Sequence, residues 1–311
     1  MLNTWQISNQ NGNQATILNY GARLIDWSAE VTNGRNIIVG YDHVEDYLQD
    51  GACMGAIAGP YANRIAGAQV NIDGKTINLG ANEGVNHLHG AQDGLQLVYW
   101  QLEARTENAI TLVHQHLGSS DVGYPGNIIF KVTYTVTEQD ELIIDIKAQS
   151  ERIVPIGPTG HAYINLGEHS KNINDHTLQL NAESYTPVDE QNIPNGSIEP
   201  MPEEYDFQSA KAVTASLDNN FVVKHGQNSV PVATLVSPDG KLTLEVCSDY
   251  PGIQVYTADH MSTPFVSRNA ICLEPQYFPD APNKTNFPFE FTEPGKPFHK
   301  FIKYQLKNTE L

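Results

Sequence analysis

The chain has 311 residues, of which 40% are hydrophobic and 17% charged, an ordinary composition for a globular protein. Asp and Glu outnumber Lys and Arg by 36 to 18, which gives a formal charge of −18. Nucleic-acid binding and peripheral membrane binding both rely on clustered basic residues. The charge balance therefore argues against both classes, and it disfavours polyphosphate or other strongly anionic substrates.

The sequence carries no recognisable targeting or cross-linking signal. Residues 1–12 are polar and contain no apolar signal-peptide region, and no run approaches the roughly 18 apolar residues of a membrane span. The three cysteines, Cys53, Cys247 and Cys272, are widely spaced and form no C-x-x-C pair. We therefore expect a cytoplasmic protein without a disulfide framework.

Apolar residues alternate with a period of two in several segments, which is typical of half-buried strands. In chain order we expect strands at 70–72 and 77–79 around an Asp73-Gly74 turn, at 127–137 and 141–149, at 232–236 and 242–246 around Pro238-Asp239-Gly240, and at 298–306. Helical patterns are weak, and only residues 42–48 and 206–212 resemble short helical turns. The 24 Gly and 18 Pro residues supply turns throughout. These patterns predict an all-β protein, a large antiparallel β-sandwich, with residues 1–311 forming one domain.

Several common catalytic fingerprints are missing. The sequence contains no G-x-G-x-x-G, no P-loop, no G-x-S-x-G and no H-E-x-x-H. Two H-x-H pairs are present, His87/His89 and His114/His116. On a strand both imidazoles of such a pair face the same side, so the four histidines form a candidate zinc site. The simpler alternative is that both spacings arise by chance among eleven histidines.

Five polar residues stand in settings that suggest a site. His89 lies beside Gly90, where a ligand can approach the backbone, and His161 follows a Pro/Gly-rich turn and opens an apolar stretch. Arg64 sits among small and apolar residues, so it needs a partner if buried. Glu274 follows an apolar run and precedes a proline, which predicts a strand end. For each the alternative is structural: a turn or core histidine, a buried ion pair or, for Asp218, an Asx turn.

Taken in order, five segments resemble the aldose 1-epimerases, also called galactose mutarotases. The segments cover most of the chain and are Tyr61-Ala62-Asn63-Arg64-Ile65, Asn86-His87-Leu88-His89-Gly90, Gly123-Tyr124-Pro125-Gly126, His161-Ala162-Tyr163-Ile164-Asn165-Leu166, and Leu273-Glu274 with Pro279-Asp280-Ala281-Pro282-Asn283. Each segment alone is a weak signal, but five in the family's order are specific. The resemblance implies a large antiparallel β-sandwich, in agreement with the period-two alternation.

The resemblance also implies roles for individual residues. Glu274 is similar to the general base that takes the proton of the anomeric hydroxyl, and His161 to the general acid that protonates the ring oxygen. His89 is an alternative or additional proton donor. The remaining implied sugar-binding residues are Asn63, Arg64, His89, Asp218 and Gln254, with an aromatic face such as Tyr163 or Phe278. No cofactor and no metal are implied, and the partner is a small-molecule sugar bound by a monomer or homodimer.

A carboxylate and an imidazole suit this chemistry, because mutarotation needs one base and one acid on opposite sides of the hemiacetal. Opposite charges across the site are expected to favour an ionised Glu274 and a protonated His161. Arg64 and His89 are placed to hold the oxygen on which charge develops.

The sequence departs from the family pattern at four places. They are Gly160 where Asn is usual, Pro275 where Thr or Ser is common, Asn219 where His is common, and Gly94-Leu95-Gln96-Leu97 in place of Gly-Phe-Asp-Lys. These changes leave the preferred sugar open among glucose, galactose, a pentose and a reducing disaccharide such as maltose. Two other functions remain as alternatives: a hexose-6-phosphate epimerase-like enzyme and a non-catalytic carbohydrate-binding protein.

Overall fold

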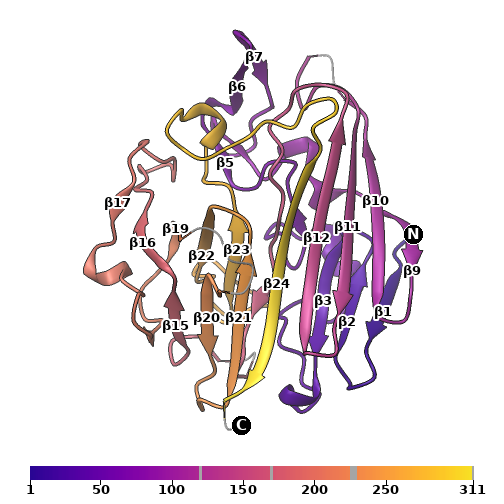
Figure 1. The fold of residues 1–311 in the computed structure, drawn as a ribbon, viewed down its shortest axis with the longest axis vertical. Helices are drawn as coiled ribbons and strands as arrows, with labels where there is room; N and C mark the ends of the chain where they lie inside the picture. The colour runs from indigo at the N-terminus through magenta and orange to yellow at the C-terminus, as the bar shows by residue number, and fades with distance from the viewer. Residues whose placement is uncertain (119–120, 169–170, 225–229, 310–311) are drawn as a thin grey trace.

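The computed structural model describes residues 1–118, 121–168, 171–224 and 230–309, and its regular structure is mostly antiparallel β-sheet (Figure 1). The largest sheet has nine strands, in the order β18-β15-β20-β21-β24-β12-β11-β10-β9. Their bounds in that order are Lys211–Ala212, Thr177–Leu180, Ala233–Val236, Leu242–Ser248, Phe298–Asn308, Glu141–Ser150, Ile128–Val136, Ala109–His116 and Gln101–Arg105.

A six-stranded sheet, in the order β14-β23-β22-β19-β16-β17, carries half of the site described below. Its strands are Tyr163–Ile164, Ile271–Gln276, Gly252–Tyr256, Asp218–Val223, Ala182–Tyr185 and Glu199–Pro200. A three-stranded sheet consists of β1 (Thr4–Ser8), β2 (Gln14–Leu18) and β3 (Arg23–Ser28). Three short pairs complete the strands: β13 (Thr159–Gly160) with β4 (Ile57–Ala58), β5 (Arg64–Ile65) with β8 (His87–Leu88), and β6 (Gln69–Ile72) with β7 (Lys75–Asn78).

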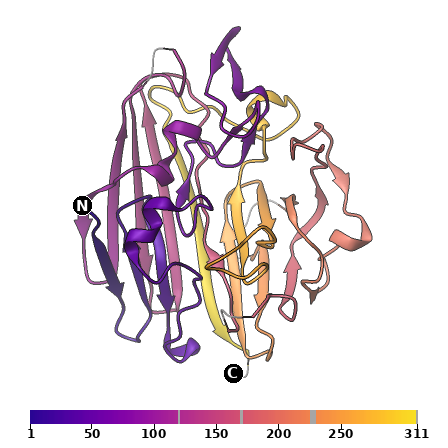
Figure 2. The same ribbon diagram turned by 180° about the vertical axis from the view of Figure 1, so that it is seen from behind.

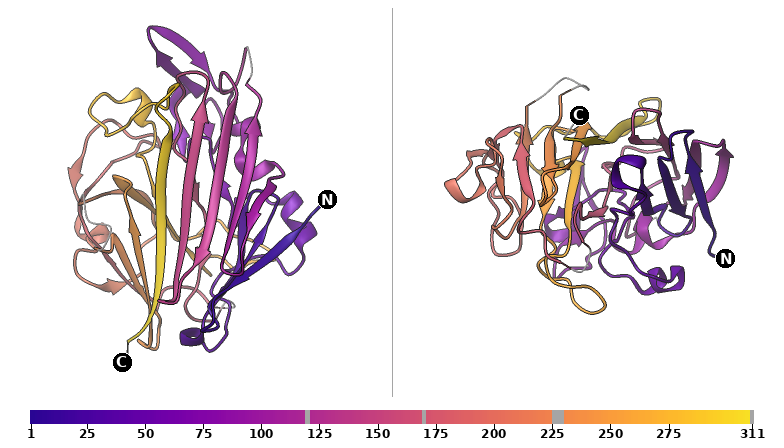
Figure 3. Two further views of the ribbon diagram at one scale, coloured as in Figure 1. Left: turned by 45° about the vertical axis from the view of Figure 1, so that its right-hand side comes forward. Right: turned by 90° about the horizontal axis from the view of Figure 1, so that it is seen from below.

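The long strands of the nine-stranded sheet form one layer, and the two other large sheets pack on the same face of it (Figures 2 and 3). Hydrogen bonds join the layers, from the Tyr134 hydroxyl to the Ala22 carbonyl beside β3 and from the Tyr304 hydroxyl to the Leu273 carbonyl of β23. The described residues therefore form the expected all-β sandwich, with the core between these layers.

The predicted alternation is confirmed in detail. In β11 and β12, one side chain in two is fully or almost fully buried, and these residues are Ile128, Phe130, Val132, Tyr134, Val136, Leu142, Ile144, Ile146 and Ala148. The Asp73-Gly74 turn joins β6 to β7, and the Pro238-Asp239-Gly240 turn joins β20 to β21, as expected. Each buried apolar face removes hydrocarbon from water, which is the main driving force for closing the sandwich.

One of the two helical expectations is wrong. Residues 44–49 form a short 3₁₀ helix that overlaps most of the predicted segment 42–48, but residues 206–212 are irregular and end in strand β18. Lys211 and Ala212 pair with β15 at the sheet edge, so tertiary pairing overrides the local pattern. The 3₁₀ helices of the described chain are Glu30–Thr32, Val44–Gln49, Ala66–Ala68, Ala91–Asp93, Leu95–Leu97, Glu203–Tyr205 and Ala281–Asn283. Within the described residues, no helix is long and apolar enough to cross a membrane.

Candidate active site

Three adjacent strands of the six-stranded sheet supply one wall of the site. Gln254 of β22 lies directly opposite Glu274 of β23, and Asp218 begins the next strand, β19. Side chains two apart on a strand share a face, so the register alone points these groups to the same side. The Gln254 amide donates to Asp218 Oδ1 at 2.7 Å, which fixes the amide orientation. Glu274 is expected at a strand end, but β23 continues through Pro275 to Gln276.

The strand continues because the proline removes no hydrogen bond from the neighbouring ladder. Strand β14 pairs with β23 only at Ile271 and Cys272, so that side of β23 is already free of a partner strand at Pro275. The Pro275 carbonyl accepts a 2.6 Å hydrogen bond from the Thr159 hydroxyl. The backbone at position 275 therefore anchors the segment that precedes His161, and a proline there leaves this contact intact.

The opposite wall is built from the β5–β8 pair and the turns next to it. The Asn63 backbone N–H donates to His89 Nδ1 at 3.1 Å, so Nδ1 is an acceptor and the neutral ring carries its proton on Nε2. Asn63 and His89 both have left-handed backbone, with φ of +66° and +49°. Such conformations are uncommon outside glycine and often occur at functional sites.

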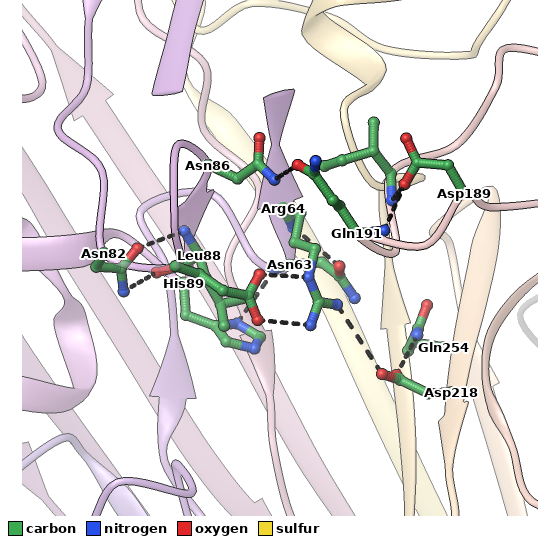
Figure 4. A network of polar contacts seen from close by, with 12 residues as sticks. Asn63, Arg64, Asn82, Asn86, Leu88, His89, Asp189, Gln191, Asp218 and Gln254 are labelled. Atoms are coloured by element: carbon green, nitrogen blue, oxygen red, sulfur yellow. Dashed lines mark hydrogen bonds and ion pairs between the residues drawn. The ribbon is translucent and has the colours of Figure 1, made fainter. Parts of the chain in front are cut away.

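The Arg64 guanidinium is held by two carboxylates (Figure 4). Glu83 accepts two hydrogen bonds from it, at 2.6 and 2.9 Å, and Asp218 lies 3.9 Å from Nη1. Glu83 is not among the residues predicted from the sequence, because nothing in its local sequence shows that its turn folds back onto Arg64. The bidentate pair fixes the plane of the guanidinium at the edge of the site.

His161 stands between β13 and β14, with Nε2 3.5 Å from Glu274 Oε2. Its ring stacks on Tyr163, with 5.2 Å between ring centroids, and meets the edge of His89 at 5.5 Å. The preceding Gly160 points the other way: a Cβ on it would lie 3.2 Å from Ile144 in the core. The Gly160 departure therefore changes core packing and leaves the imidazole side of the strand untouched.

All seven predicted site residues line one pocket of about 320 Å³. The pocket also has a wall that the sequence analysis did not identify: Gly51, Ala52, Cys53, Leu88, Tyr256, His260 and Met261. Tyr256 could have been predicted from the sequence, because it lies two residues after Gln254 on the same strand and therefore points to the same face. Of the two suggested aromatic faces, Tyr163 lines the pocket, whereas Phe278 is fully buried against Phe287 in the core.

Burial opposes the charge states expected from the sequence. The Glu274 side chain is 2% exposed, and this burial raises its pKa well above the ordinary value, with a further upward contribution from Asp218. Burial also lowers the pKa of His161 to about 4, and that of His89 falls well below its usual value. The surroundings therefore favour a neutral carboxylic acid facing a neutral imidazole over the ion pair.

The histidine pairs do not form the zinc site that the H-x-H spacing suggested. His87 contacts the Gly80 carbonyl and the Tyr124 hydroxyl, and His116 contacts the Tyr124 carbonyl. Neither pair belongs to a group of three potential metal ligands among the described residues. One such group exists, with ligand atoms within 4.8 Å of one another: His161, Cys272 and Glu274.

The two remaining departures lie beside the pocket. Asn219 is 8% exposed and pairs with Val255 between β19 and β22. In the Gly94–Leu97 segment, Leu95 is fully buried, and the Gln96 side chain donates to the His89 carbonyl at 2.8 Å. The second substitution therefore touches the backbone of a site residue.

Comparison with known proteins identifies the family to which this antiparallel sandwich and its carboxyl–imidazole pair belong. The aldose 1-epimerase family model matches residues 3–305. The chain therefore belongs to the aldose 1-epimerase family, and it is an isomerase.

Its relatives cover nearly the whole chain. It is 29% identical to the aldose 1-epimerase of Escherichia coli, covering 96% of this chain and 94% of that protein. It is 31% identical to the human galactose mutarotase, covering 91% of this chain and 87% of that protein. It is also 31% identical to the maltose epimerase of Levilactobacillus brevis, covering 96% of this chain and 93% of that protein. The crystal structure of an aldose epimerase homologue from C. elegans superposes with a TM-score of 0.93 at 27% identity, with 99% of each chain covered.

Proposed function

We propose that this enzyme interconverts the α and β anomers of a free aldose or a reducing disaccharide, with Glu274 as the base and His161 as the acid. The observation that carries the proposal is their placement: two buried ionisable groups 3.5 Å apart that line the same pocket. The anomeric hydroxyl and the ring oxygen are bonded to the same carbon. The two groups lie next to each other and not on opposite sides of the hemiacetal as expected from the sequence, and a pair this close can serve both oxygens at once.

Ring opening moves two protons and breaks one bond. Glu274 takes the proton of the anomeric hydroxyl, the electron pair of that O–H bond forms the C1 carbonyl, and the bond from C1 to the ring oxygen breaks. His161 gives its proton to the ring oxygen. Rotation about the C1–C2 bond presents the other carbonyl face, and the same steps in reverse close the ring to the other anomer.

The burial of the pair assists this direction of transfer. The ring-opened state leaves a neutral Glu274 and a neutral His161, the two forms that burial favours. The ionised pair that meets the cyclic sugar is the less stable arrangement in these surroundings. The ring-opening step therefore returns the pair to the charge states that burial favours, whereas forming the ionised pair before that step costs free energy. Each positioned proton transfer typically contributes about 10²–10⁴-fold.

The other predicted residues would bind the sugar. Asn63, Arg64 and His89 present donors from one wall, and Asp218 with its partner Gln254 presents acceptor and donor groups from the other. Tyr163 offers an apolar ring face next to His161. Proton transfer and hydrogen bonding account for the whole reaction, so the proposal needs no cofactor.

The charge of the pocket favours uncharged sugars over sugar phosphates. Among the described residues, Arg64 is the one Lys or Arg that lines the pocket, and its charge is already matched by Glu83 and Asp218. A phosphate would add negative charge at a pocket whose described lining offers no unmatched Lys or Arg. The relative named maltose epimerase supports including reducing disaccharides among the substrates.

Polarimetry of freshly dissolved α-glucose, α-galactose and β-maltose, with enzyme against blank and in the presence of a chelator, tests this function. Acceleration of any one supports cofactor-free mutarotation, and the ranking of rates identifies the substrate. If none is accelerated while glucose 6-phosphate is, the hexose-6-phosphate alternative holds. Binding of these sugars without acceleration would establish a carbohydrate-binding protein.

The broader setting stays as predicted from the sequence. We propose that residues 1–311 act as one catalytic domain in the cytoplasm, as a monomer or homodimer, with a small sugar as the partner and no role for nucleic acid or membranes.

A further inference from the structure

A buried ion pair outside the resemblance motifs lies close to the site. Arg23 of β3 and Asp50 are both completely buried, and Arg23 Nη1 lies 2.7 Å from Asp50 Oδ2. Taking two charges out of water is costly, and apolar residues of similar volume often stabilise a protein as well as such a pair does. Stability alone is therefore a poor explanation for this pair, and its other contacts are informative.

The Arg23 guanidinium bonds to two segments that in turn hydrogen-bond to the backbones of the active-site histidines. Nη1 donates to the Met54 carbonyl at 2.7 Å, and Nη2 donates to the Gln96 carbonyl at 3.1 Å. Just after Met54, the backbone pairs with His161: the Gly55 N–H donates to the His161 carbonyl at 3.0 Å. Gln96 holds the His89 carbonyl through its side-chain amide at 2.8 Å. One guanidinium thus links the backbones of His161 and His89.

Asp50 shapes the turn that supports the stacked ring beside His161. Its carboxylate accepts hydrogen bonds from the backbone N–H groups of Ala52, at 3.0 Å, and Met54, at 2.9 Å. The Ala52 carbonyl in turn accepts the Tyr163 hydroxyl at 2.9 Å. The Tyr163 ring stacks on His161 with 28° between ring planes, so the turn indirectly sets the position of the imidazole.

The imidazole has few direct restraints of its own. Among the described residues, His161 Nδ1 has no hydrogen-bond partner, and Nε2 faces Glu274. The direction of the ring therefore depends on its backbone bonds and on Tyr163. A misplacement of about 1 Å in a catalytic group can lower the rate about 10²-fold.

We propose that Arg23 and Asp50, with Gln96, are positioning residues that hold His161 and His89 in register with Glu274. The inference rests on the proposed function, because it assumes that His161 transfers a proton. The two charges oppose each other at the acid: Asp50 raises the pKa of His161 and Arg23 lowers it. Removing both together therefore tests position while changing the acidity of His161 less than either single change.

The test compares two double variants by polarimetry, on a sugar that the unmodified enzyme turns over. In Arg23→Met/Asp50→Leu we expect a folded protein whose kcat falls about 10- to 100-fold, with the acidic limb of the pH profile kept. The control is Lys303→Met/Glu141→Leu, which removes a half-buried pair on the nine-stranded sheet, 2.8 Å from Lys303 Nζ to Glu141 Oε1. We expect its kcat to stay within twofold of the unmodified enzyme.

A single variant covers the case in which the double variant does not fold. Gln96→Met removes the amide that holds the His89 carbonyl and leaves the ion pair intact, and we expect kcat/KM to fall about 3- to 10-fold with a changed His89 imidazole NMR signal. A folded double variant with kcat within twofold of the unmodified enzyme overturns the proposal. So does Gln96→Met with unchanged kinetics and an unchanged NMR signal. An unmodified enzyme inactive on every sugar defeats the proposed function instead, and the NMR comparison still reports on positioning.

Discussion

Replacing Glu274 with glutamine should move activity and stability in opposite directions. The amide has nearly the same size as the carboxyl group but cannot accept the anomeric proton. We expect kcat to fall by at least about 10²–10⁴-fold, equivalent to about 2.7–5.5 kcal/mol of barrier. Substrate binding should change far less, because the side chains that contact the hydroxyls are kept.

The same substitution should stabilise the fold at neutral pH. Because burial raises the pKa of Glu274, the folded state loses stability as pH rises from the ordinary pKa toward the raised one. Each unit of that shift corresponds to about 1.4 kcal/mol at high pH. Glutamine carries no charge and avoids this cost. We expect the melting temperature of Glu274→Gln to exceed that of the unmodified enzyme at pH 8, and to match it below pH 4.5.

Polarimetry and thermal unfolding at pH 4 and pH 8 measure both effects. Glu141→Gln is the control, since Glu141 is also a strand glutamate but lies on the other sheet and is paired with Lys303. It should leave kcat unchanged and should not raise the melting temperature. A Glu274→Gln enzyme with kcat within tenfold of the unmodified one refutes the assignment of the base. The argument from burial is refuted if the melting temperature of Glu274→Gln, minus that of the unmodified enzyme, is lower at pH 8 than at pH 4.

Three further outcomes follow from the same geometry. The active form of the Glu274–His161 pair holds one proton in total. The pH profile of kcat should therefore have an acidic limb near pH 4, where the pair gains a second proton on His161, and an alkaline limb well above pH 4.5, where the pair loses its one proton from Glu274. A kcat that stays constant from pH 3 to 10 would contradict this. Glu83→Gln should raise KM about 3- to 10-fold with little change in kcat, because Arg64 keeps one hydrogen bond in place of a bidentate pair, and steady-state polarimetry will show whether kcat falls instead. Burial lowers the pKa of His176 to about 4, so the free energy of unfolding should decrease as pH falls from 6.5 toward 4. Urea titrations of His176→Gln should show a smaller decrease of this free energy over the same range, by up to about 1.4 kcal/mol per pH unit.

Residue types and their order along the chain were enough to predict much of this enzyme. The alternation in 127–137 and 141–149 predicted β11 and β12, and the Asp-Gly turns predicted two hairpins, because a half-buried strand needs one apolar face and a tight turn needs particular residues. The five ordered motifs predicted the family, and the resemblance to that family implied seven residues that all line one pocket. Such signals are local, so a sequence shows them directly.

Contacts between distant segments depended on the tertiary structure. Glu83 meets Arg64 through a turn, and Arg23 meets Asp50 and Met54 of one distant segment and Gln96 of another. The local pattern at 206–212 gave way to pairing at a sheet edge. The protonation preference of the Glu274–His161 pair also needed the fold, because desolvation depends on what covers a group in space. Local sequence specified which groups were available, and packing specified their partners, their burial and therefore their chemistry.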